Sequence, residues 1–124
     1  MFNPLRIHRV SFRHAFDGFV HNIKSQPNFR FHLLAMISVI LTGIYFSISF
    51  YEWMTLLITF NMVIVSEMLN TAIEAMVDLI TLERRQDAKI AKDVSAGMVL
   101  VSAIFSIVIG LFIFVPKILI TLNQ

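Results

Sequence analysis

The sequence predicts an all-α integral membrane protein, in which an N-terminal amphipathic surface helix precedes three transmembrane helices. Composition is the first reason: 57% of the 124 residues are hydrophobic, and the mean hydropathy of +0.78 exceeds what one soluble core of this size requires. The second reason is that the apolar residues form three stretches, each able to cross a hydrocarbon layer about 30 Å thick. Because so short a chain cannot bury this much apolar surface by itself, we also expect it to oligomerise.

The N-terminal segment, about residues 5–25, is predicted to form the surface helix. Apolar side chains recur there at helical spacing, and polar or charged side chains fall on the opposite face. Such a helix suits the surface of a membrane leaflet, and the alternative is that its apolar face packs against other helices. Gln26 and Pro27 are expected to break the helix before the first span. The apolar face consists of Phe12, Ala15, Phe16, Phe19, Val20 and Ile23.

Three spans are predicted, at about residues 31–50, 53–80 and 94–116, within a single domain that covers residues 1–124. The first span falls in the stretch 31–51, which carries no formal charge. The second joins a shorter uncharged run to the helical segment EMLNTAIEAMVDLI. At about 1.5 Å per residue this helix is about 42 Å long, so its end is expected to emerge from the hydrocarbon core.

The positive charges predict the orientation of the chain. Every Lys and Arg except Lys117 lies before Phe31 or between Ile80 and Val94. Three spans put these two segments on the same side of the membrane, and the positive-inside rule identifies that side as the cytoplasm. Pro116 and Lys117 are interpreted as the far interface. We therefore expect a multi-pass protein of the bacterial cytoplasmic membrane, with a cytoplasmic N-terminus and an external C-terminus.

The second span carries a row of polar side chains inside the membrane, where charges are costly and point to function. At about 100° per residue, Glu67, Asn70, Glu74 and Asp78 fall within an arc of about 80° on one helix face. Like charges on one face repel each other unless a cation or proton intervenes, which favours a cation or proton site. The alternative is a polar seam that only holds helices together by hydrogen bonds.

The segment LERRQDAKIAKD, residues 82–93, is interpreted as a charged cytoplasmic loop between the second and third spans. A solvated turn is the plainest interpretation of such a run. Its position favours a second one, because Lys92 and Asp93 stand where the third span enters the membrane. A lysine there can bind phosphate as a point charge, beside an acidic face suited to a hard metal cation. The other charged residues of the segment are Glu83, Arg84, Arg85, Asp87 and Lys89.

Several of these segments together resemble a known family. The run EMLNTAIE from Glu67 to Glu74, with Val77-Asp78, Ala91-Lys92-Asp93 and Ala96-Gly97 after it, resembles the signature of the bacterial diacylglycerol kinase family of integral membrane enzymes. The segments NFRFH (28–32), EWM (52–54) and 109–117 look like the Gram-positive branch, which phosphorylates undecaprenol. The resemblance implies a homotrimer with three transmembrane helices and one surface helix per chain, and active sites at subunit boundaries near the cytoplasmic surface.

The resemblance also implies roles for individual residues. By position, Glu67 corresponds to the general base and Glu74 to a magnesium ligand, with Asn70 as a polar partner in the site. The resemblance assigns contacts with the ATP nucleotide to Lys92 and Asp93, and it places Glu83, Arg84 and Arg85 near the nucleotide.

His32 is the one departure from the family pattern. The diacylglycerol-specific branch carries a metal-binding glutamate in the first helix at the position of His32, so a second acidic ligand from this helix is in doubt. Two interpretations stay open: the histidine contacts the nucleotide or magnesium, or it is an interfacial histidine without a chemical role.

The expected function is therefore a lipid kinase that transfers the γ-phosphoryl group of ATP to undecaprenol with the help of Mg²⁺. The four glycines are scattered singly and form no phosphate-binding loop, so side chains and metal must bind the phosphates. Three alternatives remain: a diacylglycerol kinase, a membrane transport protein whose polar row lines an ion path, and a structural subunit. No nucleic-acid partner is expected, and the absence of cysteine excludes disulfides and thiolate metal sites.

Overall fold

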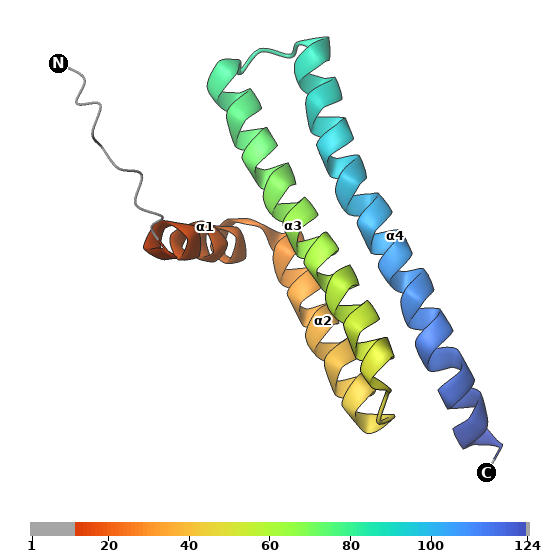
Figure 1. The fold of residues 1–124 in the computed structure, drawn as a ribbon. Coiled ribbons are helices and arrows are strands. Elements are labelled where there is room, and N and C mark those ends of the chain that lie inside the picture. The colour runs from red at the N-terminus through yellow and green to blue at the C-terminus, as the bar shows by residue number, and fades with distance from the viewer. Residues whose placement is uncertain (1–11, 124) are drawn as a thin grey trace.

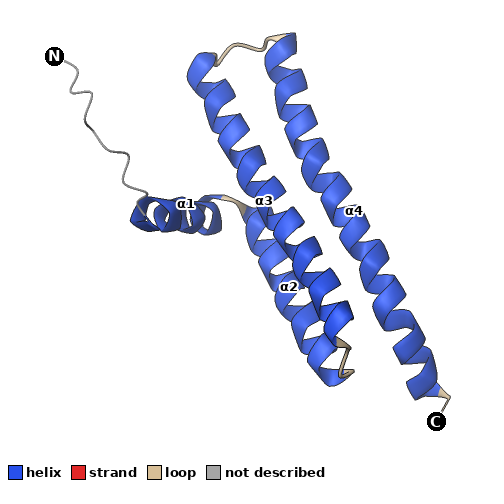
Figure 2. Cartoon of the chain, viewed as in Figure 1, coloured by secondary structure: helices blue, strands red, loops and turns tan. Residues whose placement is uncertain are grey.

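The computed structural model describes residues 12–123, and the regular structure in that range consists of four helices (Figure 2). They are α1 (Phe12–Ser25), α2 (Pro27–Tyr45), α3 (Phe50–Ile80) and α4 (Gln86–Leu122). The part of the predicted surface helix before Phe12 lies outside the described residues.

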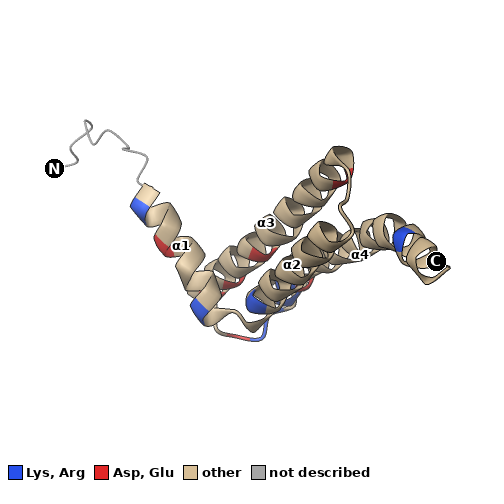
Figure 3. Cartoon of the chain, turned by 90° about the horizontal axis from the view of Figure 1, so that it is seen from below, with Lys and Arg blue, Asp and Glu red and all other residues tan. Residues whose placement is uncertain are grey.

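The three long helices run side by side, and α1 lies across their direction near the start of α2 (Figure 1). Helices α3 and α4 form a long antiparallel pair, and the shorter α2 covers only part of the length of α3. All three are long and apolar enough to cross a membrane, and Figure 3 shows that uncharged residues make up most of each one. The expectation of three membrane-spanning helices is therefore confirmed in length and composition. That α1 lies on a membrane surface stays a prediction.

Local sequence determines where α1 and α2 begin and end. The predicted break is confirmed: α1 ends at Ser25, and α2 begins with Pro27, whose missing amide hydrogen and fixed φ suit the first helical position. The expected end of the first span near residue 50 was wrong, because α2 stops at Tyr45. Ser47 adopts a positive φ of 49° in the tight turn of residues 46–49, a conformation that cannot continue a right-handed helix.

A capping box starts α3 directly after this turn. The Ser49 amide donates to Oε2 of Glu52 at 2.6 Å, and the Glu52 amide donates to Oγ of Ser49 at 3.3 Å. Two of the free donors at the helix start are thereby satisfied. Helix α3 thus begins at Phe50, slightly before the start predicted for the second span.

The charged segment 82–93 is mostly helical, and its interpretation as one long loop was wrong. Helix α4 starts at Gln86, so the connection between α3 and α4 is short. Asp87 in the first turn complements the helix dipole, and Lys89 pairs with Asp93 one turn later at 2.5 Å. At its other end α4 continues past Pro116 to Leu122, so Pro116 does not end the helix.

A buried apolar cluster lies next to the turn between α2 and α3. It consists of Ile48, Leu56, Phe60 and Ile113. The Gly43 backbone approaches the indole of Trp53 so closely that an added Cβ would lie 2.8 Å from its Cη2 atom. Elsewhere many large apolar side chains on all three long helices are exposed, as expected for a chain surrounded by lipid or by further copies of itself.

Candidate active site

Glu67 is the most deeply buried carboxylate of the polar row. It lies near the middle of α3 and is only 3% exposed. Its Oε1 atom is 3.3 Å from Nε2 of His32, an 18% exposed side chain near the start of α2. A buried carboxylate is costly without a polar partner, and His32 supplies one. The structure therefore brings His32 to the predicted base, whereas the sequence left open whether this histidine contacts the nucleotide or magnesium or has no chemical role.

Asn70 and Glu74 form a second contact one turn further along α3. Nδ2 of Asn70 donates to Oε1 of Glu74 at 3.1 Å. From α4, the hydroxyl of Ser95 lies 2.7 Å from Oδ1 of Asn70 and 2.8 Å from the carbonyl oxygen of Lys92. With its acceptor side turned to Ser95, Asn70 presents its amide hydrogens to the carboxylate.

Ser95 is a member of this cluster that sequence reasoning missed. It is fully buried, with 0% of its surface exposed. A small polar residue one turn after Lys92 on the predicted third span was the available signal. Whether Ser95 faces Asn70 depends on how α4 is rotated relative to α3, and no local sequence pattern encodes that rotation.

Asp78 and Lys92 close the row at the end of α3. Nζ of Lys92 lies 2.6 Å from Oδ1 of Asp78, and both side chains remain partly exposed. The predicted nucleotide-binding lysine of α4 is thus held against the last carboxylate of the row. Asp93, the other predicted nucleotide contact in α4, points instead to Lys89.

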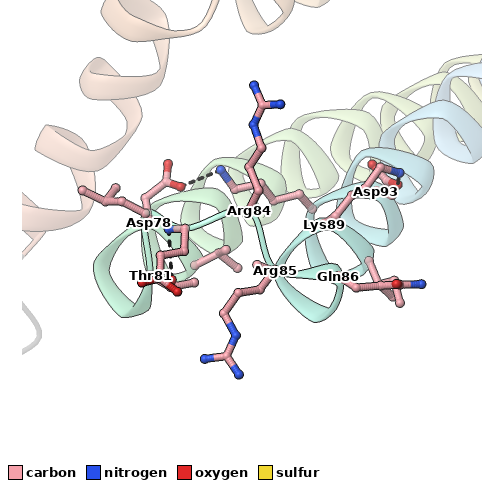
Figure 4. Close-up of a pocket in the computed structure, with 13 residues that line it drawn as sticks. Asp78, Thr81, Arg84, Arg85, Gln86, Lys89 and Asp93 are labelled. Atoms are coloured by element: carbon pink, nitrogen blue, oxygen red, sulfur yellow. Dashed lines mark hydrogen bonds and ion pairs between the residues drawn. The ribbon is translucent and has the colours of Figure 1, made fainter.

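An open pocket of about 880 Å³ lies around the short connection between α3 and α4 (Figure 4). We call it the loop pocket. Its charged lining includes all five residues that were predicted to lie near or contact the nucleotide in this region, and the side chains of Arg84 and Arg85 point away from each other. Basic groups on an open surface suit a phosphate-bearing ligand. The charged lining residues are Asp78, Glu83, Arg84, Arg85, Lys89, Lys92 and Asp93.

The predicted site residues thus form two groups within one chain. Glu67, Asn70 and Glu74 lie on the apolar part of α3, with His32 of α2 beside Glu67. Glu83 to Arg85, Lys92 and Asp93 line the loop pocket. Asn70, Glu74 and Asp78 are all bonded within the row or to α4. The row therefore connects the buried Glu67 region with the pocket, which is the arrangement expected of a site where a membrane-embedded group meets a water-soluble one.

Comparison with known proteins identifies the family. Residues 13–114 match the family described as prokaryotic diacylglycerol kinase. The chain belongs to this family. The undecaprenol kinase of Bacillus subtilis (strain 168) is 43% identical over 115 residues, which are 93% of this chain and 94% of the relative. The diacylglycerol kinase of Synechocystis sp. is 36% identical over 111 residues, which are 89% of this chain and 63% of the relative.

Membership of this family confirms the resemblance seen in the sequence and decides between classes of function. The chain is a kinase of the prokaryotic diacylglycerol kinase family with three helices able to span a membrane. A transport protein and a purely structural subunit, the two alternatives from other classes, are thereby set aside.

Glu74 of this kinase fits a magnesium site. Within residues 12–123, no three His, Asp or Glu side chains are grouped so that they could hold a metal ion. Mg²⁺ is commonly bound through only one or two carboxylates, and waters and substrate phosphates complete its shell. One oxygen of Glu74 accepts the hydrogen bond of Asn70, and none of the described side chains donates to the other. The donor set therefore suits a single-carboxylate ligand.

An apolar groove of about 480 Å³ begins beside His32 and runs between α2, α3 and α4 of this kinase. Apolar side chains dominate it, among them Met36, Leu56, Phe60 and Phe114. Its surface is of the kind that a hydrocarbon chain can cover, and its His32 end lies next to Glu67.

Proposed function

We propose that this kinase transfers the γ-phosphoryl group of ATP to the terminal hydroxyl of undecaprenol, with Mg²⁺, at the cytoplasmic face of the bacterial cell membrane. The observation that carries the proposal is the continuous polar row on α3, from the buried Glu67 to the Asp78–Lys92 pair at the charged loop pocket. A lipid alcohol reaches such a row from the membrane, and a nucleotide reaches it from water.

In this proposal Glu67 is the general base. Its carboxylate accepts the proton of the lipid hydroxyl while the hydroxyl oxygen attacks the γ-phosphorus and the bond to ADP breaks. His32, 3.3 Å away, holds the carboxylate in place. Burial excludes water from Glu67, which disfavours transfer of the phosphoryl group to water instead of the lipid.

The phosphate-binding part of the proposal consists of Glu74, Asn70 and the basic residues of the loop pocket. Glu74 would hold magnesium, and Asn70 orients its carboxylate through the 3.1 Å hydrogen bond. Magnesium bound there would neutralise phosphate charge as the phosphoryl group is transferred. Lys92, with Glu83, Arg84, Arg85 and Asp93 around it, would contact the nucleotide.

Undecaprenol is proposed as the acceptor because the relative that bears this substrate's name is 43% identical and matches this chain over nearly its whole length. The apolar groove beside His32 offers a surface for part of an isoprenoid chain. Diacylglycerol is the second candidate, because the family description and the Synechocystis relative name it.

The proposal includes the assembly and the orientation. Three copies would form the trimer, with sites completed at subunit boundaries, and α1 would lie on the cytoplasmic leaflet. The exposed apolar surface of the long helices supports the assembly. The orientation is supported by the sequence positions of Lys and Arg, all of which except Lys117 lie before Phe31 or between Ile80 and Val94.

The acceptor is tested by supplying purified protein in lipid nanodiscs with labelled ATP, Mg²⁺ and either undecaprenol or diacylglycerol. We expect label in undecaprenyl phosphate at a kcat/KM at least about tenfold above that for diacylglycerol, a difference of about 1.4 kcal/mol in transition-state stabilisation. A Glu67→Gln preparation controls for contaminating kinases. Preference for diacylglycerol would move the assignment to the second candidate, and no lipid labelling would refute both.

The orientation is tested with a single cysteine, since the chain has none of its own. Gln86 is exposed at the start of α4. A Gln86→Cys variant should resist an impermeant thiol reagent in intact cells and react with it in inverted vesicles. Labelling in intact cells would place the loop pocket outside, on the wrong side for ATP.

A further inference from the structure

The ion pair between Asp78 and Lys92 joins a residue with a proposed substrate contact to one without any assigned role. Lys92 is the proposed phosphate contact on α4, and Asp78 lies in the last turn of α3. Their charged atoms are 2.6 Å apart, and Figure 4 shows the carboxylate of Asp78 directed at the amine across the pocket. The only other ion pair that joins α3 to α4 within residues 12–123 lies far away, between Glu52 and Lys117.

The geometry leaves Lys92 restrained yet available. Its side chain is 38% exposed and that of Asp78 is 53% exposed, and both line the loop pocket. An ammonium group has three N–H donors, of which the carboxylate takes one and leaves the others for phosphate oxygens. A free lysine side chain carries about 2 kcal/mol of rotamer entropy, part of which is lost when it binds a phosphate. Because the Asp78 carboxylate already restrains Nζ, Lys92 should lose less of this entropy when ATP binds.

We propose that Asp78 is a positioning residue that holds the ammonium group of Lys92 at the loop pocket, where it meets the phosphates of ATP. This inference rests on the proposed function. It assigns Asp78 a part in nucleotide binding, which differs from the proposed roles of Glu67 as base and Glu74 as metal ligand. Loss of the Asp78 carboxylate should therefore weaken the binding of ATP while the chemical step stays intact.

A purely structural clamp between α3 and α4 is the competing explanation. An acidic residue in the last turn of a helix is disfavoured by the helix dipole, and α3 has no basic residue in that turn, so Lys92 could serve only to offset Asp78. The chain provides a matched control for this explanation. Glu52 and Lys117 pair at 3.0 Å across the same two helices, at their opposite end, and neither has a proposed part in the reaction.

The test compares Asp78→Asn, Asp78→Glu and Glu52→Gln with the wild type in nanodiscs. The measurements are KM for ATP and kcat with saturating undecaprenol, and thermal unfolding in detergent. For Asp78→Asn we expect KM for ATP to rise about fivefold, as for the loss of one partly exposed ion pair, with kcat within about twofold of wild type. Asp78→Glu, which keeps the carboxylate, should recover most of the loss, and Glu52→Gln should leave KM for ATP unchanged.

With an active wild-type enzyme, each of the following outcomes overturns the inference. Equal changes in KM for Asp78→Asn and Glu52→Gln, or an unchanged KM in both, would make the Asp78 pair a structural clamp. A lower KM in Asp78→Asn would mean that Asp78 competes with ATP for Lys92. If Asp78→Asn does not fold, Asp78→Glu decides, because positioning requires that its KM for ATP stay within about twofold of wild type. An inactive wild type would count against the proposed function instead.

Discussion

The two halves of the helix bundle are built on different principles. In the turn half, around residues 46–49, the buried cluster of Ile48, Leu56, Phe60 and Ile113 holds three helices together beside the close Gly43–Trp53 contact. In the loop half, from Glu67 to the α3–α4 connection, polar contacts link the helices and an open charged pocket replaces apolar packing. Apolar packing stabilises without regard to direction, whereas polar contacts fix particular atoms. We therefore expect the turn half to supply stability and the loop half to supply the geometry of the proposed site.

Glu67→Gln is expected to have the largest effect, because it should abolish most of the turnover without changing the stability of the turn half. The isosteric change should keep fold, assembly and nucleotide binding, and should lower turnover by about a hundredfold or more, the usual range for loss of a general base. Turnover, ATP affinity and oligomer stability in detergent should be measured on one preparation. The matched control is Glu52→Gln on the same helix in the turn half, which should keep turnover. Normal turnover in Glu67→Gln would make the polar row a seam between helices.

Glu74→Gln should have the next largest effect. A neutral amide is a poor ligand for a hard cation, so we expect turnover to fall at least about tenfold and direct Mn²⁺ binding, followed by EPR, to weaken. Assembly should survive, since the Glu74 side chain has its one hydrogen bond to a described side chain with Asn70, within α3. Wild-type activity at both limiting and saturating Mg²⁺ would remove Glu74 from the metal site.

Gly43→Ala changes the turn half, so it should lower stability and leave the binding of ATP unchanged. Its new Cβ would lie 2.8 Å from Cη2 of Trp53 and 3.0 Å from Cδ1 of Ile48, so the ring must move. Overpacking of this kind costs about 1–3 kcal/mol. We expect a lower unfolding temperature in detergent with an unchanged KM for ATP. Gly110→Ala, where an added Cβ meets nothing within 4 Å, is the control. A raised KM would show that the halves are coupled.

Ser95→Ala tests the finest detail of the loop half. Removal of its hydroxyl takes away the donor at Oδ1 of Asn70, which should loosen the amide that orients Glu74. We expect a rise of about two- to fivefold in the Mg²⁺ concentration for half-maximal rate, the effect of one neutral hydrogen bond. Ser102→Ala is the control, because the Ser102 hydroxyl donates only to the carbonyl oxygen of Met98 in its own helix. Equal behaviour of the two variants would refute the orienting role.

The helix boundaries show how far local sequence reaches. The break at Gln26 and Pro27 was predicted correctly, because the fixed geometry of proline acts locally. The end of α2 and the start of α4 were not. The turn after Tyr45 depends on a positive φ at Ser47, which a serine rarely adopts. The charged run after Arg85 looked like a loop, yet Lys89 and Asp93 pair within a helix.

The sequence by itself determined the three apolar helices, the shared face of Glu67, Asn70, Glu74 and Asp78, and the family signature, because hydrophobicity and helical periodicity are properties of each segment alone. Only the tertiary structure decided the partners: His32 for Glu67, Ser95 for Asn70 and Lys92 for Asp78. Each partner comes from another helix. Its position depends on how that helix is rotated and shifted against α3, and packing along the whole length of the helices determines both.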